Sequence, residues 1–324
     1  MVRSVWVQAF NKMAQTIGVL IATYRRSNEL LRCLAALEKQ THQADEILLV
    51  VREDDTETRS RLSDNALKLL SIRIITVSVP GVVAARNAGL DAYTTDILAI
   101  IDDDTSPHID WLSRVMQNFR NDPALGGLGG RDRCFDGTEF DEHQESVVGK
   151  IQWFGRTIGN HHRGFGELRE VDVLKGANMS YRSNAIADVR FDTRLKGNGA
   201  QPSEDFCFSV AVKHKGWKLA YDPLVLVDHY ASQRAEVRHY VGVAAVNDAS
   251  VFRDFAYNQV ISIWHALSPL RRGVFFVWSV LIGTGVFPGL IQAVRFTPKL
   301  GVHSWRRFLI AQQGKMDAFR DLIF

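Results

Sequence analysis

Three consecutive aspartates, Asp102, Asp103 and Asp104, follow directly after the apolar run at 96–101. Carboxylates crowded in this way repel one another unless a cation lies between them, and two that are spaced i, i+2 after a strand point to the same side. Such oxygen ligands suit a hard divalent ion, Mg²⁺ or Mn²⁺, which can in turn neutralise a diphosphate. The alternative is a solvated acidic turn that caps the next helix.

A second acidic pair, Glu204 and Asp205, follows the glycine-containing stretch 196–203 and begins a predicted helix. A carboxylate in the first turn either stabilises the helix dipole or, beside a hydroxyl substrate, acts as a general base. His229 ends another apolar stretch. A single histidine is commonly structural, but beside an aspartate cluster it is also a reasonable third metal ligand.

Two further polar groups carry weaker signals. Arg86 and Asn87 lie on a predicted helix after a Pro-Gly pair, where they can reach a phosphate or a carboxylate network. His161, His162 and Arg163 lie in a glycine-rich stretch, where they either bind an anionic acceptor or belong to an ordinary solvated loop. Residue types alone leave both alternatives open.

The elements that must position these residues are strands and helices in alternation. Four apolar, β-branched runs predict strands at 15–23, 46–51, 72–79 and 96–101. Helical patterns separate them, so the sequence predicts an α/β fold with a largely parallel sheet covered on both faces.

Polar residues follow three of these four strands: Thr23-Tyr24, Arg52–Asp55 and Asp102–Asp104. Ligands of such sheets bind beyond the carboxyl ends of the strands. We therefore expect a polar ligand site along this edge, and this position favours the metal-binding interpretation of the aspartates. Further along, the sequence predicts a helix from a capping Ser203 to Lys215, then strands at 217–222 and 224–230.

The last part of the chain combines basic charge with an apolar run. Residues 231–324 carry 11 Lys/Arg and 5 Asp/Glu, whereas residues 1–230 carry 28 and 31. Residues 273–294 contain no charged side chain, which is enough for a spanning helix of about 20 residues. Pro288, four glycines and Gln292 also allow an interfacial or re-entrant segment or a buried core hairpin. Because the basic residues flank this run, a lipid headgroup layer fits better than nucleic acid.

The amino-acid composition of the chain excludes several other classes of protein. The 324 residues are 46% hydrophobic and 23% charged, which excludes disorder, collagen-like repeats or coiled coil for the whole chain. Cys33, Cys134 and Cys207 lie far apart, which argues against a disulfide framework and for a reducing compartment. Residues 1–15 lack the apolar core of a secretory signal and predict an amphipathic surface segment or a disordered leader.

Taken in order, these segments resemble the family 2 glycosyltransferases, which have the GT-A fold with a Rossmann-like, doubly wound mixed sheet. The resemblance covers residues 16–230 and is carried by VLIATYRRSNELLRCLAAL, ARNAGL, IIDDD, GANMSYRS, EDFCFSVAVKHKGWKLAYDP and VDH. It implies a catalytic domain at 16–235, with a nucleotide-binding half at 16–125 and an acceptor half at 126–235. A mostly helical, membrane-associating tail would follow at 236–324.

The resemblance implies an inverting, hexosyltransferase-type enzyme that uses a nucleotide-diphosphate sugar donor and Mn²⁺ or Mg²⁺. Asp205 would be the catalytic base, with Glu204 beside it on the acceptor side. Asp102, Asp104 and His229 would hold the metal. The residues expected to bind the nucleotide sugar are Thr23, Tyr24, Arg52, Glu53, Asp54, Arg86, Asn87, Asp102, Asp103 and Asn178.

One position departs from the family pattern. The family usually has an aspartate directly after the second strand, where it meets the base, but here Arg52 occupies that position and either Glu53 or Asp54 takes over the contact. The base is therefore not assigned to uridine. The Gln-x-x-Arg-Trp signature of processive members is absent after Asp205, which predicts transfer of a single sugar.

The tail adds an expectation about the acceptor and the location. A basic, apolar segment behind a transferase domain suggests work on a lipid-linked saccharide in cell-surface polysaccharide synthesis. The expected location is the cytoplasmic face of the inner (cell) membrane, held by one apolar tail segment.

Two rival classes share some of these features. A nucleotidyltransferase also carries a metal-binding acidic cluster on a doubly wound sheet, but it would show a glycine-rich triphosphate loop where this chain reads Thr-Tyr-Arg-Arg. A non-catalytic nucleotide- or sugar-binding scaffold that partners another transferase is supported only by Arg52. The intact carboxylates at 102–104 and 204–205 speak against it.

Overall fold

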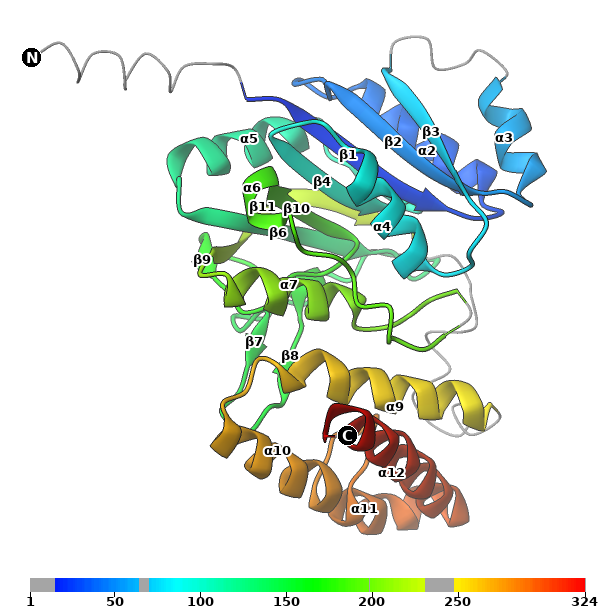
Figure 1. Ribbon diagram of the computed structural model, residues 1–324, viewed down its shortest axis with the longest axis vertical. Coiled ribbons are helices and arrows are strands. Elements are labelled where there is room, and N and C mark those ends of the chain that lie inside the picture. Colours follow the sequence, from blue (N-terminus) through cyan, green and yellow to red (C-terminus); the bar gives the residue numbers. More distant parts are fainter. Residues whose placement is uncertain (1–14, 64–69, 198, 231–247, 324) are drawn as a thin grey trace, which may run out of the picture.

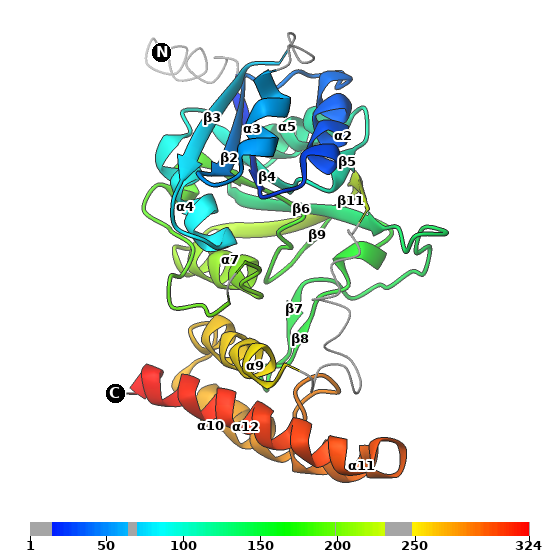
Figure 2. The ribbon, with the colours of Figure 1, turned by 90° about the vertical axis from the view of Figure 1, so that its right-hand side faces the viewer.

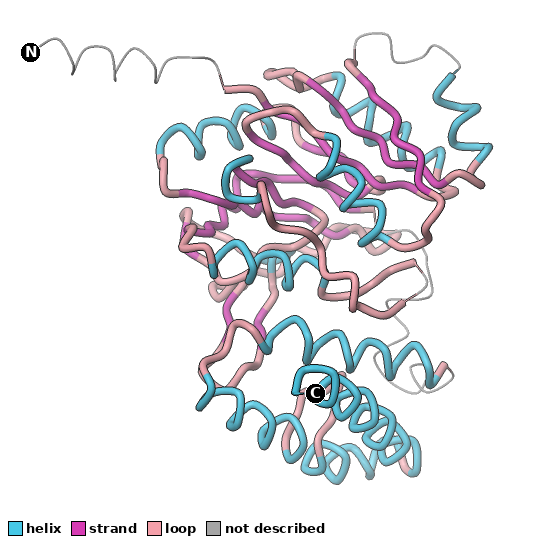
Figure 3. Tube along the Cα trace, in the orientation of Figure 1, coloured by secondary structure: helices cyan, strands magenta, loops and turns pink. Residues whose placement is uncertain are grey.

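A computed structural model describes residues 15–63, 70–197, 199–230 and 248–323 of the chain. The leader expected at 1–15 lies outside the described residues except for its last position. Figure 3 shows the strands gathered in the upper part of the molecule and helices forming the lower part.

A mixed nine-stranded sheet forms the upper part (Figure 1). In spatial order its strands are β3 (Ile72–Val77), β2 (Glu46–Arg52), β1 (Ile17–Thr23), β4 (Ile97–Asp102), β10 (Asn178–Arg182), β6 (Leu125–Cys134), β11 (Lys218–His229) and β5 (Thr105–Pro107), with β9 (Arg169–Glu170) also paired to β11. The first four are parallel, β10 is antiparallel to both of its neighbours, and β11 is parallel to β6.

Helices cover both faces of this sheet, which confirms the doubly wound α/β prediction. Alternate residues of β1 enter two different cores. Val19 and Ile21 pack with α2 (Ser27–Glu38) and α5 (Trp111–Asn121), whereas Leu20 packs with α4 (Val82–Ala92) and α7 (Glu204–His214). Because β1, β2 and β4 are buried on both faces, their sequences are continuous apolar runs. The other helices of the sheet domain, among the residues that the structure describes, are α3 (Thr56–Ser63) and α6 (Ser183–Ile186).

Two details around α7 and β11 differ from the sequence prediction. The two strands predicted at 217–222 and 224–230 are one strand, β11, with a shift of register between Asp222 and Leu226. Ser203 precedes α7 as predicted, but with φ at +72° its side chain makes no capping hydrogen bond. The carboxylates of the first helical turn accept from the backbone N–H groups there instead.

Within the described residues, four helices follow the sheet domain and pack beneath it (Figures 1 and 2). They are α9 (Ala249–Trp264), α10 (Pro269–Leu281), α11 (Leu290–Leu300) and α12 (Val302–Ile323). Helix α9 contacts α7 on one side and α12 on the other. A hairpin of β7 (Lys150–Ile151) and β8 (Thr157–Ile158) reaches down to α10, where the rings of Phe154 and Trp278 lie 5.1 Å apart.

The uncharged run at 273–294 forms a helical hairpin and not one continuous helix. Its turn contains Gly283, whose φ of +68° favours glycine, bridged to Pro288. Arg307 and Lys315 of α12 donate hydrogen bonds to backbone carbonyls of this turn and of the end of α10. Among the helices of the described ranges, none has the length and apolar character needed to cross a membrane.

Candidate active site

The parallel strands end at one edge of the sheet and bring the polar residues of that edge together. Thr23 at the end of β1 donates from Oγ1 to Asp103 Oδ2 at 2.7 Å. Asp103 also accepts from Arg26 at 2.6 Å and is buried. Burial raises the pKa of Asp103 to about 6, while the Arg26 guanidinium opposes that shift. Asp103 therefore braces the loop after β4 from inside.

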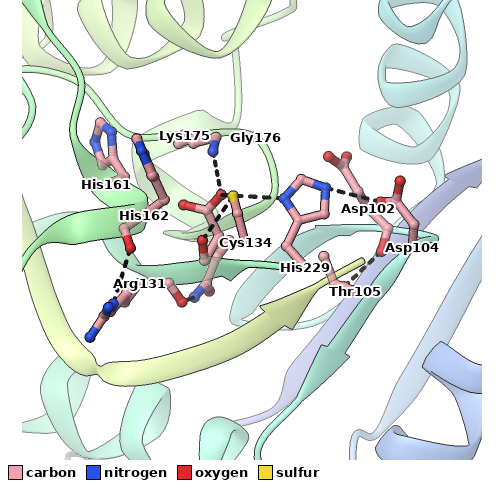
Figure 4. Close-up of polar contacts among 12 residues, drawn as sticks. Asp102, Asp104, Thr105, Arg131, Cys134, His161, His162, Lys175, Gly176 and His229 are labelled. Atoms are coloured by element: carbon pink, nitrogen blue, oxygen red, sulfur yellow. Dashed lines mark hydrogen bonds and ion pairs between the residues drawn. The ribbon is translucent and has the colours of Figure 1, made fainter. Parts of the chain in front are cut away.

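Asp102, Asp104 and His229 form a group whose possible ligand atoms all lie within 4.8 Å of one another. Figure 4 shows the His229 ring directed toward the two aspartates from the end of β11. Its Nε2 lies 3.2 Å from Asp104 Oδ1. Two carboxylates and one imidazole are a donor set that suits Mn²⁺ or Mg²⁺, so these residues fit the expected metal.

The other nitrogen of the same imidazole faces a fully buried carboxylate. His229 Nδ1 lies 3.3 Å from Asp132 Oδ2 on β6, and Lys175 forms an ion pair with that oxygen. Burial opposes the charge of Asp132, but Lys175 and His229 hold its pKa well below the usual range. Burial likewise opposes protonation of His229, yet Asp104 and Asp132 raise its pKa well above the ordinary value. Asp132 thus fixes the orientation of His229.

Arg86 on α4 joins the aspartates of β4 to the acidic pair of α7. Its guanidinium is buried and donates to Asp102 at 2.9 Å and to Glu204. A Cβ at Gly176 would lie 2.7 Å from this guanidinium, so a glycine is needed for the close approach. Burial and the neighbouring Asp205 raise the pKa of Glu204, against the effect of Arg86.

Asp205 is held at the first turn of α7. Its Oδ2 accepts from the backbone N–H of Gly176 at 2.8 Å, and its Oδ1 accepts from that of Phe206 at 2.8 Å. Against the effect of burial, Glu204 raises the pKa of Arg86 and Asp132 raises that of Lys175, and the charge of Asp205 adds to both shifts. The acidic pair and the aspartates of β4 therefore belong to one electrostatic network.

The end of β2 carries a compact polar cluster beside Tyr24. The Arg52 guanidinium lies 4.0 Å from the Tyr24 ring centroid and donates to Asp54 at 2.8 Å. The Tyr24 hydroxyl donates to the same carboxylate at 3.0 Å, and Arg52 lowers the pKa of Asp54. Glu53 is exposed. Arg52, the last residue of β2, and Asp54 thus form an ion pair at this end of the strand.

Three residues expected near ligands make hydrogen bonds inside the protein. Asn87 bonds through both ends of its amide to the backbone of Phe191. Asn178 is buried and bonds to Trp111 and to backbone carbonyls of β6 and β11. His161 is buried and contacts the Val173 carbonyl, so it does not lie in a solvated loop. A role of Asn87 or Asn178 toward the nucleotide sugar stays a prediction.

Sequence reasoning missed three residues of this network: Arg26, Asp132 and Lys175. Arg26 lies in the Tyr-Arg-Arg segment after β1, and Lys175 directly precedes the Gly-Ala-Asn segment that contributes to the family resemblance. Asp132 lies in Arg-Asp-Arg after a glycine-rich stretch and carries no chemical pattern of its own.

The chain is similar in sequence and in fold to known glycosyltransferases. The model of the family described as "Glycosyl transferase family 2" matches residues 18–189, more than half of the chain. A glucosyl-dolichyl phosphate glucuronosyltransferase of Haloferax volcanii is 24% identical over 224 residues, which is 66% of this chain and 68% of that protein.

Two further similarities extend this comparison. A poly-beta-1,6-N-acetyl-D-glucosamine synthase of Staphylococcus aureus is 24% identical over 221 residues, 65% of this chain; the chain spans about half of that synthase, 48% of its length. A solved mannosyltransferase from Pyrobaculum calidifontis, in complex with GDP-Man and Mn²⁺, matches with a TM-score of 0.55 and 14% identity. That match covers 96% of this chain and 89% of the other. It shows the shared GT-A fold.

Proposed function

The chain belongs to glycosyl transferase family 2, and from this premise we propose that it transfers one sugar, with inversion, from a nucleotide-diphosphate sugar to a hydroxyl of a lipid-linked saccharide. The observation that carries this proposal is the bridge made by Arg86. It connects Asp102, on the side of the predicted metal and diphosphate, with Glu204, which is adjacent to the predicted base. These two hydrogen bonds support the proposal that the donor-side and acceptor-side residues act within one network.

Asp205 is the residue proposed to remove the acceptor proton. An acceptor hydroxyl is a poor nucleophile, and a positioned carboxylate increases its reactivity by taking the proton as the oxygen attacks. The oxygen forms a bond to the anomeric carbon, the bond from that carbon to the diphosphate oxygen breaks, and the nucleoside diphosphate leaves. The two backbone N–H contacts of Asp205 orient the carboxylate for this step.

The leaving diphosphate requires positive charge beside it. Asp102, Asp104 and His229 would hold a divalent cation, and such an ion supplies charge neutralisation to the leaving group when it is bound. Asp103 keeps the loop after β4 in place through the hydrogen bonds that it accepts from Thr23 and Arg26.

The nucleotide is proposed to bind over the ends of β1 and β2. Tyr24 offers an aromatic surface there, and the paired Arg52 and Asp54 offer polar groups to the base and ribose. The H. volcanii relative is named for a dolichyl phosphate-linked acceptor and the S. aureus relative for a polysaccharide product. These names support the proposal of a lipid-linked saccharide acceptor in polysaccharide synthesis.

The proposal is tested by turnover of the full chain. Sugars linked to UDP, GDP, dTDP and CDP are each incubated with Mn²⁺ and a lipid-linked saccharide fraction, and release of nucleoside diphosphate is measured. We expect release from one donor that depends on the acceptor fraction. If a donor binds but none of these incubations releases nucleoside diphosphate, the chain is instead a non-catalytic scaffold.

A further inference from the structure

Helices α10 and α11 carry an exposed apolar surface, which we call the α10–α11 face. They line one apolar groove, with Val277 and Leu281 on one side and Ile291 on the other. The side chains that define the face are all at least 39% exposed: Leu270, Val277, Leu281, Ile282, Ile291 and Val294. Five of these six side chains, all except Val294, line the same groove, and an exposed apolar surface of this kind is typical of a site that binds another molecule.

Contacts with α12 hold the hairpin that carries the α10–α11 face in place. Arg307 and Lys315 are buried and bind carbonyls of the turn and of the end of α10. On its other side the hairpin is packed on α12, where Phe276 and Phe319 rings lie 4.9 Å apart. Figures 1 and 2 both place α10 and α11 at the end of the molecule away from β1–β3.

The charged residues around the α10–α11 face indicate what kind of partner it binds. Residues 255–316 contain seven Lys/Arg and no Asp or Glu. Two of the seven are the buried Arg307 and Lys315, while Arg295, Lys299 and Arg306 are exposed. A second copy of the chain docked through the same face would bring positive charges close to one another. An anionic lipid surface instead offers negatively charged headgroups and, beneath them, apolar acyl chains.

Near the start of α10 an aromatic side chain extends the same region. Arg271 donates to the backbone carbonyls of Gln152 and Trp153, which holds the tip of the β7–β8 hairpin beside α10. Trp153 is 59% exposed. Tryptophan is favoured at the boundary between lipid headgroups and hydrocarbon.

We propose that the α10–α11 face docks on an anionic phospholipid bilayer, with both helices lying in the plane of the membrane surface. The apolar side chains of the face enter the headgroup–acyl boundary, and Arg295 and Lys299 contact lipid phosphates. The sequence predicts that this lipid surface is the cytoplasmic face of the cell membrane. This inference extends the proposed function but is tested by binding alone, so either can fail without the other.

Vesicle flotation of the purified full chain tests the proposal. We expect binding to vesicles that contain phosphatidylglycerol, little binding to phosphatidylcholine alone, and weaker binding at high salt. The double variant V277D/I291D places charges in the face and should lower affinity for phosphatidylglycerol vesicles on the order of 100-fold. The matched control V79D/L224D adds two aspartates at apolar positions that are equally exposed elsewhere, and it should bind like wild type.

Charge reversal gives a second, independent measure. R295E/K299E should weaken binding to phosphatidylglycerol vesicles by roughly tenfold or more. The control K39E/R120E makes the same charge change at exposed positions at the end of α2 and on α5, and it should bind like wild type. Equal binding of V277D/I291D and wild type would overturn the proposal. So would a wild-type dimer in solution that V277D/I291D converts to a monomer, because the face would then be an interface between copies.

Discussion

His229 Nδ1 lies 3.3 Å from Asp132 Oδ2, on the opposite side of the imidazole from Asp104. The two residues are 97 positions apart and meet because β6 and β11 are paired in parallel. A carboxylate behind a ligating histidine fixes the ring orientation and raises its basicity. The structure thus gives the proposed metal ligand a positioning residue that is itself buried and paired with Lys175.

Replacement of that positioning residue should weaken metal binding. In Asp132→Asn the negative charge behind His229 is lost, so the affinity of the chain for Mn²⁺ should fall by roughly 10- to 100-fold. Mn²⁺ binding is measured directly by electron paramagnetic resonance at neutral pH. Lys175→Met is the matched control, because it breaks the same buried ion pair but keeps the carboxylate beside His229. Equal losses in both variants would show a general effect of the broken pair.

The assignment of the base is tested by Asp205→Asn. The variant keeps an oxygen that can accept from one of the two backbone N–H groups but cannot take the acceptor proton, so transfer should fall by about 10²- to 10⁴-fold. Nucleotide affinity should stay near that of the wild type. Asp91→Asn, an exposed site paired with Arg190, serves as control. A folded Asp205→Asn enzyme that retains transfer, or that loses nucleotide binding, would contradict the assignment.

Burial of Lys315 predicts a pH dependence of stability in the C-terminal helices. Burial lowers the pKa of Lys315 to about 7, below its value in an unfolded chain. Between these two values the unfolded state binds more protons, so the free energy of unfolding should rise with pH, by up to about 1.4 kcal/mol per unit from this residue.

Urea unfolding between neutral pH and about pH 9 measures this slope. Lys315→Met should be less stable, because carbonyls of Ser279 and Phe287 lose their donor, and should lack the extra slope. Lys299→Met, at an exposed position of α11, should keep it. An identical slope in Lys315→Met and wild type would contradict the prediction.

The strands and the edge where the site lies are predictable because local pattern encodes them. A strand buried on both faces has to be a continuous apolar run, as in β1 and β4, and the polar residues that follow must gather at the carboxyl edge. The amino-acid pattern alone is therefore enough to assign Thr23, Arg52 and Asp102 to one edge of the sheet.

Other contacts of the site and of the C-terminal helices join residues that are far apart in the sequence, and no local sequence pattern predicts them. Asp132 and Lys175 reach His229 only through the order of β10, β6 and β11 in the sheet. Likewise, the run at 273–294 bends because its turn is bound by Arg307 and Lys315 of a later helix. The lack of charge in residues 273–294 predicts that they contact an apolar environment, but it does not predict that they form a hairpin.

The proposed role of Asp102, Asp104 and His229 is to support metal-dependent binding of a nucleoside diphosphate. It is tested most directly by thermal unfolding with UDP, GDP, dTDP or CDP, each with and without Mn²⁺, on wild type and on Asp104→Asn. A ligand that binds only the folded state stabilises it by about 2.7 kcal/mol at 100 times its Kd. We predict that one nucleotide raises the Tm of the wild type only with Mn²⁺, and that Asp104→Asn abolishes this shift. A Tm shift that is equal without Mn²⁺ and in the variant, or no shift with any nucleotide, would contradict this role of the three residues.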